Sequence, residues 1–340
     1  MTLPAIFGLS GLELTAEERE LFRSVNPLGF ILFARNIDSP EQVRALTDSL
    51  RTLLGRDDLP ILIDQEGGRV ARLGEPHWRK WPPAEDFARA FARDAPRARA
   101  ATLCNYQALA LDLAALGITV DCAPVLDVPE AGAHDIIGDR AFGDDPEAIA
   151  ELGAAVLEGF GKAGVVGVIK HIPGHGRARA DSHEALPRVD ASLQALERDL
   201  APFRALAGAP MAMTAHIVYE AWDSEHCATL SRRIIGDVIR DQIGFDGLLM
   251  SDDLDMKALE GPIPQRAVAA LNAGCDVALN CWGRIDDMRG MAQALPSAST
   301  DCLRRLSVAL SVIKNVTDVR DIAGLQAELV ARRDDLLAGP

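Results

Sequence analysis

Eight short runs of apolar residues recur along the chain, separated by longer stretches of mixed polar and apolar residues. The runs are nearly continuous in Val, Ile, Leu, Phe and Met and do not alternate with polar positions. Strands that are covered by helices on both faces have this composition, as in a parallel sheet. The predicted strands span residues 5–9, 29–33, 60–63, 118–122, 165–169, 211–214, 247–250 and 276–280.

The stretches between these runs are long enough for helices and contain residues that mark helix ends. Ser39 and Pro40 suit the N-cap and first turn of a helix, and apolar residues then recur at helical spacing. Gly164 and Gly274 suit the positions that follow helix ends. Further helices are predicted over residues 87–116 as one helix or two, 146–163, 192–207, 231–243 and 266–273, and one or two more in the tail.

Alternation of eight strands with helices favours the α/β class, and within it a (β/α)₈ (TIM) barrel. We expect one domain over residues 1–340, with a helical tail from about residue 316 to 340 packed on the barrel. A doubly wound open sheet is the alternative, but no Gly-x-Gly-x-x-Gly motif follows the first strand. Polar residues also follow several different strands, and a barrel gathers strand ends in one ring. These residues are Asp64, Asp121, Lys170, His171, His216, Asp252 and Asn280.

Composition and charge narrow the class of protein further. Apolar residues make up 48% of the 340 and charged residues 25%, as in ordinary globular proteins. The net charge of −15 disfavours binding to nucleic acids and to anionic membranes. The first basic residue is Arg19 and no apolar run has the length of a membrane span, so we expect a cytoplasmic protein. The six cysteines include no Cys-x-x-Cys pair, and we expect reduced thiols in the core.

Two segments contain candidate groups for binding a polyhydroxyl ligand. Residues 64–72 follow the third predicted strand and hold two adjacent glycines that permit a tight turn. Asp64 can accept hydrogen bonds from two adjacent hydroxyls and Arg72 can donate to others, although an ion-paired loop is the alternative. Residues 138–143, Gly-Asp-Arg-Ala-Phe-Gly, are a weaker signal that a structural turn explains equally well.

Residues 170–183 hold three of the seven histidines of the chain. Residues 173–176, Pro-Gly-His-Gly, must turn sharply, and we expect residues 177–180 to form a mobile loop. Asp181 and His183 are two positions apart, so their side chains lie on the same side of an extended segment. The carboxylate can then orient the imidazole, which suits a general acid/base near neutral pH.

Residues 245–256 contain a strand that carries Asp252 to its C-terminal end. A carboxylate in that place can act as a nucleophile on a carbon with developing positive charge. We expect the nearby Asp253 and Asp255 to cap a helix instead.

A zinc site is the alternative use of the histidine segment. His171, His175, His183 and Asp181 can all ligate zinc, which would make the protein a metal-dependent barrel hydrolase of amides or esters. The histidines have three and then seven residues between them, which matches no structural zinc pattern, and Lys170 would repel a cation. We therefore expect neither a metal nor another cofactor.

Three motifs together resemble the family 3 glycoside hydrolases over roughly residues 29–280. They are Lys-His-Ile-Pro-Gly-His-Gly at 170–176, Asp-x-His at 181–183 and Ser-Asp-Asp-Leu at 251–254. More narrowly, the chain is similar to the bacterial β-N-acetylhexosaminidases of cell-wall recycling. The resemblance implies a retaining exo-β-N-acetylglucosaminidase that removes terminal N-acetylglucosamine from muropeptides through a covalent glycosyl-enzyme intermediate. It implies a monomer or weak dimer whose partner is a small sugar, N-acetylglucosamine linked to anhydro-N-acetylmuramic acid peptides.

The resemblance also implies a role for each matching residue. Asp252 matches the nucleophile, His183 the acid/base and Asp181 the partner of His183. The residues that match those holding N-acetylglucosamine are Asp64, Arg72, Arg140, Lys170 and His171. Two positions depart from the pattern, because Ile172 stands where Phe is common and Asp255 where Ser is frequent.

The source of the catalytic acid separates this chain from larger members of the family, which take it from a second domain. Here we expect the segment 174–189 of the barrel to supply it. A non-catalytic sugar-binding barrel is a third class of function, and the presence of Asp252, Asp181 and His183 disfavours it.

Overall fold

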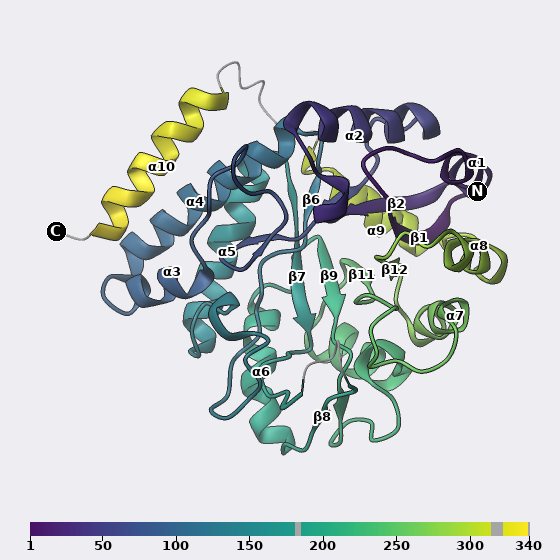
Figure 1. Cartoon of the computed structure of the whole chain (residues 1–340). Coiled ribbons are helices and arrows are strands. Elements are labelled where there is room, and N and C mark those ends of the chain that lie inside the picture. Colours follow the sequence, from purple (N-terminus) through teal and green to yellow (C-terminus); the bar gives the residue numbers. More distant parts are fainter. Residues whose placement is uncertain (181–184, 314–321, 339–340) are drawn as a thin grey trace.

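Eight parallel strands form a ring at the centre of the protein, in a computed structural model that describes residues 1–180, 185–313 and 322–338 (Figure 1). A parallel bridge between Met250 and Val277 connects the two edge strands of the sheet, which brings the ring to closure. The predicted (β/α)₈ barrel is therefore confirmed, and each of the eight predicted strands is present. Their spatial order is β11 (Leu248–Met250), β9 (Met211–Thr214), β7 (Val166–Ile172), β6 (Val120–Asp121), β3 (Ile61–Ile63), β2 (Pro27–Leu32), β1 (Leu3–Gly8) and β12 (Ala278–Asn280).

Two short strand pairs that we did not predict lie in the loops that follow barrel strands. An antiparallel hairpin of β4 (Gln65–Gly67) and β5 (Val70–Ala71) follows β3. A parallel pair of β8 (Arg188–Val189) and β10 (Val218–Tyr219) joins the loops after β7 and β9. Each strand has only two or three residues, too few for a periodic pattern in the sequence.

Helices surround the barrel and begin largely where the capping residues predict. Ser39 caps α2 and Ser192 caps α6. The predicted segment 87–116 contains parts of two helices. Asp94 caps the second of them, which begins at Ala95 and has Pro96 in its first turn. The helices are α1 (Ala16–Val25), α2 (Pro40–Leu54), α3 (Ala84–Phe91), α4 (Ala95–Ala115), α5 (Pro146–Lys162), α6 (Leu193–Ala205), the π-type η4 (Ile234–Gln242), α7 (Ile263–Ala273), α8 (Ile285–Ala294), α9 (Thr300–Leu310) and α10 (Ile322–Ala338), with short 3₁₀ turns η1 (Ala34–Asn36), η2 (Gly138–Arg140) and η3 (Ala228–Leu230).

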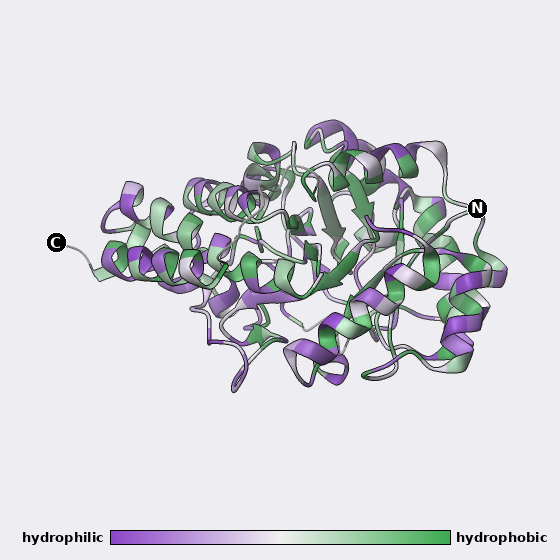
Figure 2. Cartoon of the chain, turned by 90° about the horizontal axis from the view of Figure 1, so that it is seen from above, coloured by the Kyte–Doolittle hydropathy of each residue, from purple (hydrophilic) through white to green (hydrophobic). Residues whose placement is uncertain are grey.

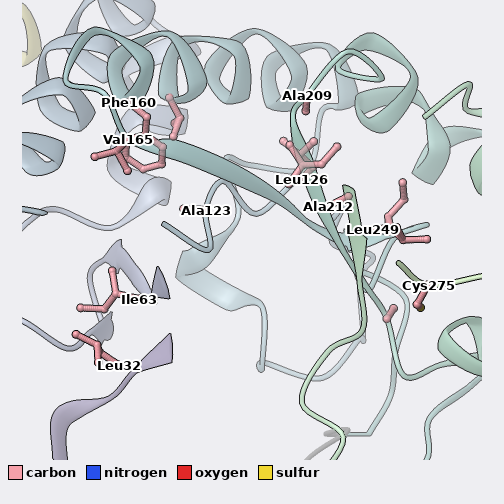
Figure 3. Packing of buried hydrophobic residues seen from close by; sticks show 14 of the residues in the cluster. Leu32, Ile63, Ala123, Leu126, Phe160, Val165, Ala209, Ala212, Leu249 and Cys275 are labelled. Carbon is pink, nitrogen blue, oxygen red and sulfur yellow. The ribbon is translucent and has the colours of Figure 1, made fainter. Parts of the chain in front are cut away.

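Alternate residues of the strands belong to two separate apolar layers. Ile6, Leu62 and Met250 pack with other inward-facing side chains inside the barrel, whose N-terminal end is covered by α9. Their neighbours in the strands, such as Leu32 and Ile63, pack outward with the helices (Figure 3). Seen from above, the outer helices mix hydrophilic and hydrophobic residues while the central strands are mostly hydrophobic (Figure 2). This two-sided burial explains the continuous apolar runs of the sequence.

The C-terminal helix α10 lies along α4 (Figure 1). Gln326 Nε2 donates to the backbone oxygen of Ala108 at 3.0 Å, and Arg333 Nη1 donates to Asn105 Oδ1 at 3.0 Å. The predicted start of the tail at residue 316 lies outside the described residues. All six cysteines are buried and free, as predicted. No helix in the described part of the chain is both long enough and apolar enough to cross a membrane.

The helix α6 offers a test of how much the outer apolar layer contributes to stability. Leu200 is fully buried, whereas Leu193 in the same helix is 56% exposed. We expect Leu200→Ala to lower the free energy of unfolding by about 2–5 kcal/mol, because it leaves a cavity between α6 and the barrel. Leu193→Ala should change it by less than about 0.5 kcal/mol. Urea unfolding followed by circular dichroism measures both, and equal effects would contradict the assigned packing.

Candidate active site

The carboxyl ends of the strands surround a cavity of about 200 Å³. All six described residues that we predicted for the site line it, and these are Asp64, Arg72, Arg140, Lys170, His171 and Asp252. Inward-facing barrel residues such as Ile31, Met213 and Leu279 also line it. The other two predicted residues, Asp181 and His183, lie outside the described residues.

Three of the polar residues predicted to form the ring do not line this cavity. Asp121, His216 and Asn280 are fully buried. The ring of polar strand ends therefore has one set of residues that faces the cavity and another set enclosed by protein.

An irregularity in β7 allows two consecutive residues to face the cavity. Lys170 pairs with Met213 of β9, but Ile172 pairs with Thr214, so His171 is an extra residue in the strand. Side chains of consecutive strand residues normally point to opposite faces, and a bulge of this kind redirects one of them. Lys170 and His171 consequently both line the cavity.

Lys170 is the centre of a buried network of charges. Its Nζ lies 3.1 Å from Asp64 Oδ1 and 2.6 Å from Glu66 Oε1. Arg140 forms a bidentate ion pair with the same Glu66, through Nε and Nη2 at 2.8 Å each. Arg72 Nη2 lies 3.0 Å from Asp64 Oδ2. Only 3% of the Lys170 side chain and 6% of that of Glu66 are exposed. Three cationic side chains thus face two carboxylates in this network.

The network keeps its members ionised in spite of their burial. Burial opposes ionisation of Asp64, but Lys170 and Arg72 outweigh it and lower the pKa of Asp64. The pKa of Glu66 is likewise well below its usual value, because Arg140 and Lys170 outweigh the effect of burial. Burial would lower the pKa of Lys170, but Glu66 and Asp64 raise it. The cavity therefore presents fixed charges and hydrogen-bonding groups that can orient the hydroxyls of a ligand.

The hairpin β4–β5 brings Arg72 beside Asp64. Its turn requires Gly67, which has a φ of +95° and approaches Pro82 so closely that an added Cβ would lie 2.5 Å from the backbone oxygen. Gln65 Oε1 accepts from the backbone N–H groups of Arg72 and Leu73 at 2.8 and 2.9 Å. The glycines predicted to permit a tight turn do so.

Asp252 follows β11 at a point where the backbone is fixed to β12. Ser251 donates its N–H to the oxygen of Val277 at 3.0 Å, and its Oγ accepts the N–H of Leu279 at 3.0 Å. Asp252 Oδ1 then accepts the N–H of Asp253 at 2.8 Å. These contacts place a half-buried carboxylate at the cavity.

The prediction that Asp253 and Asp255 cap a helix is wrong, since the next helix begins only at Ile263. Asp253 Oδ1 accepts instead from the N–H groups of Cys281, in the loop after β12, and of Asp255, at 3.1 and 3.2 Å. Asp255 pairs with Arg284. The two carboxylates bind groups from distant parts of the chain instead of the N–H groups of a nearby helix end.

Asp127 is a site residue that sequence analysis missed. It is fully buried, and its Oδ2 lies 2.7 Å from His171 Nδ1. Its Oδ1 accepts the backbone N–H groups of His171 and His175 at 3.1 and 2.6 Å. Glu66 was also missed, although it lies inside a segment that we singled out. The one signal for Asp127 in the sequence is a carboxylate shortly after a predicted strand.

The segment after β7 is held in place as far as Ala178. An added Cβ on Gly176 would lie 1.9 Å from the backbone oxygen of Val128. Arg177 Nε lies 2.5 Å from Asp199 Oδ2 and Arg177 also pairs with Glu130, while Ala178 is buried. Arg177 and Ala178 of the segment 177–180 thus contact the rest of the protein in this structure, and the mobility of that segment stays a prediction.

Among the residues that the structure describes, no group of three or more His, Cys, Asp and Glu side chains is arranged to hold a metal ion. Of the four predicted zinc ligands, Asp181 and His183 lie outside the described residues. His171 uses its Nδ1 for Asp127.

A parallel (β/α)₈ barrel with a charged cavity at the carboxyl ends of its strands belongs to the class of barrel enzymes, whose active sites lie in this place. The chain matches the glycosyl hydrolase family 3 N-terminal domain over residues 6–305. It belongs to this family and is a glycoside hydrolase.

Named relatives cover most of the chain. A "Beta-hexosaminidase" of Alkalilimnicola ehrlichii is 45% identical over 283 residues, which are 82% of this chain and 80% of the relative. A "Beta-hexosaminidase" of Chromobacterium violaceum is 38% identical over 353 residues, with 99% and 97% covered. The structure is similar to that of NagZ from Neisseria gonorrhoeae in complex with N-trifluoroacetyl-D-glucosamine, with 33% identity, a TM-score of 0.86 and 98% of each chain covered.

The buried Asp121 offers a test of the electrostatics behind the cavity. Its Oδ1 accepts the N–H of Gln65 at 2.9 Å, and burial raises its pKa to about 8. The folded protein then holds a proton that the unfolded chain releases near pH 4, so this group makes stability fall as the pH rises from about 4 to 8. Asp121→Asn should remove this loss of stability. The difference in unfolding free energy between the variant and the wild type should therefore shift in favour of the variant by up to about 4 kcal/mol between pH 5 and 8.

Urea unfolding at pH 5, 6, 7 and 8 measures this difference. Asp48→Asn, at an exposed position of α2, gives the effect of removing one surface carboxylate. A difference between Asp121→Asn and wild type that stays constant with pH would contradict the assignment.

Proposed function

We propose that the protein is a retaining exo-β-N-acetylglucosaminidase that removes terminal N-acetylglucosamine from muropeptides in the cytoplasm, as part of cell-wall recycling. The observation that carries the proposal is the position of Asp252, whose carboxylate lines the same small cavity as the network around Lys170. A nucleophile and a set of hydroxyl-binding groups in one cavity are what a retaining glycosidase requires.

The proposed reaction has two steps. Asp252 attacks the anomeric carbon while His183, oriented by Asp181, protonates the departing glycosidic oxygen, which leaves a glycosyl ester on Asp252. His183, now neutral, takes a proton from water, and the hydroxide attacks the anomeric carbon and releases the carboxylate. Two displacements at one carbon retain the configuration.

The charges around the cavity are compatible with Asp252 as the nucleophile. Arg72, Arg140 and Lys170 neutralise Asp64 and Glu66, so these two carboxylates add no net negative charge beside Asp252. His175 adds no charge, because burial lowers its pKa to about 4.

The size of the cavity supports the removal of single terminal sugars. A volume of about 200 Å³ lies below the usual range of ligand pockets, about 300–1,000 Å³, which suits one sugar ring rather than several. The acetamido group is supported by the similarity to a NagZ that binds N-trifluoroacetyl-D-glucosamine. The muropeptide substrate and a monomer or weak dimer rest on the family resemblance, and the cytoplasmic location rests on the expectation from the sequence.

A direct experiment compares chromogenic aryl β-N-acetylglucosaminide with the matching aryl β-glucoside, and then N-acetylglucosamine-anhydro-N-acetylmuramic acid peptide. We expect turnover of the first and third. Incubation with a 2-acetamido-fluorosugar should label the peptide that contains Asp252, as read by mass spectrometry. Absence of a covalent adduct on that peptide, in an enzyme that turns over the aryl substrate, would contradict the retaining mechanism.

Asp252→Asn should lower kcat for the aryl N-acetylglucosaminide by about 10³-fold or more, because an amide cannot form the ester intermediate. The variant should keep the unfolding midpoint of the wild type within a few degrees. Asp255→Asn is the matched control, since Asp255 pairs with the exposed Arg284 outside the cavity. Near wild-type turnover by Asp252→Asn would remove the assigned nucleophile.

His183→Ala should lower turnover much more for substrates with poor leaving groups than for those with acidic ones, because acidic phenols depart with little protonation. A series of aryl N-acetylglucosaminides measures this as a steeper dependence of kcat/KM on the pKa of the leaving group. Equal losses across the series would count against His183 as the acid.

A further inference from the structure

Asp127 is fully buried and does not line the cavity, but it contacts the cavity residue His171. The segment that carries it runs beside the end of β7, because Val125 bridges to Lys170 and the N–H of Leu126 donates to the oxygen of Lys170 at 2.7 Å. One carboxylate oxygen accepts two backbone N–H groups, those of His171 and His175, and the other faces His171 Nδ1 at 2.7 Å. Asp127 thus fixes both the backbone and the ring of His171.

The protonation of Asp127 determines which nitrogen of His171 carries a proton. Burial opposes ionisation of Asp127, but the contact with His171 and the backbone N–H of His175 outweigh it and hold its pKa below the usual value. A carboxylate has only acceptors, so His171 Nδ1 must be the donor. In the neutral imidazole, Nε2 then has a free lone pair.

We infer that Asp127 is a positioning residue that keeps His171 in the Nδ1–H form, so that Nε2 accepts a hydrogen bond from a hydroxyl of the bound sugar. This inference rests on the proposed function and adds to it the direction of one hydrogen bond. The described partners of Asp64 and Glu66 are cations, and the cations themselves only donate. A neutral Nε2 adds an acceptor for a sugar hydroxyl to the wall of the cavity.

Asp127→Asn tests the inference with little change of shape. The amide oxygen of Asn can still accept the two backbone N–H groups, but its NH₂ group then faces His171 Nδ1 and donates to it. His171 must take the opposite tautomer, with the proton on Nε2 facing the sugar. The sugar hydroxyl would then have to accept from Nε2 instead of donating to it, and we expect kcat/KM for the aryl N-acetylglucosaminide to fall by about 10- to 100-fold.

A double-mutant cycle separates this role from a merely structural one. In a His171→Phe background no imidazole is present to be reoriented, so Asp127→Asn should cost less than about threefold there. The same loss in both backgrounds would overturn the inference, because it would mean that Asp127 acts on the fold and not through His171. Aryl substrates that lack one ring hydroxyl should identify the partner, since removal of that hydroxyl should abolish the difference between wild type and Asp127→Asn.

The tautomer can also be read without turnover. In ¹⁵N-histidine NMR spectra, the His171 signals are identified by their loss in His171→Phe. We expect a protonated Nδ1 and an unprotonated Nε2 in the wild type, and the reverse in Asp127→Asn. A proton on Nε2 of wild-type His171 at the assay pH would overturn the inference even if Asp127→Asn failed to fold. The proposed function fails separately, through the absence of N-acetylglucosaminidase turnover in the wild type.

Discussion

The burial of the Lys170 ammonium group is the constraint on which the site depends. A buried charge without partners is strongly destabilising, and removal of one partner from a buried ion pair costs about 3–5 kcal/mol. The partners of Lys170 come from the segment after β3, Asp64 just before the β4–β5 hairpin and Glu66 within it, and Glu66 is in turn bound by Arg140 from the loop after β6. Two loops are therefore tied to the end of one strand, so the barrel mouth and the charge network must form together.

The same network explains why a single cavity can hold both a nucleophile and sugar-binding groups. Carboxylates that bind hydroxyls would repel the carboxylate of Asp252 if they were not neutralised. Arg72, Arg140 and Lys170 neutralise Asp64 and Glu66. The stability of the folded barrel and the charge state of the nucleophile are thus served by the same ion pairs.

Much of the fold could be predicted because each barrel strand is buried on both faces, which the continuous apolar runs record. Asp64 and Lys170 could be found because each follows such a run directly, and Asp252 because it comes one residue later. Glu66 and Asp127 could not, because their roles are defined by partners 74 and 44 residues away in Arg140 and His171. Asp253 was misassigned for the same reason: its partner is the N–H of Cys281, 28 residues further on.

The two histidines His171 and His216 show what a sequence leaves undetermined even where it indicates the right residue. His171 lies near the C-terminal end of β7, and His216 follows the neighbouring strand β9. His216 Nε2 lies 3.0 Å from the backbone oxygen of Asp253, which can only accept, so this nitrogen carries the proton, and Nδ1 faces the Thr229 hydroxyl at 2.7 Å. Burial lowers the pKa of His216 and keeps it neutral, so Nδ1 accepts from Thr229. His171, facing a carboxylate through Nδ1, is held in the opposite form. A position near a strand end brings both imidazoles close to the cavity. The hydrogen-bond acceptor that each ring faces then decides its role. His216 supports the backbone beside Asp252, and His171 presents a lone pair to the cavity.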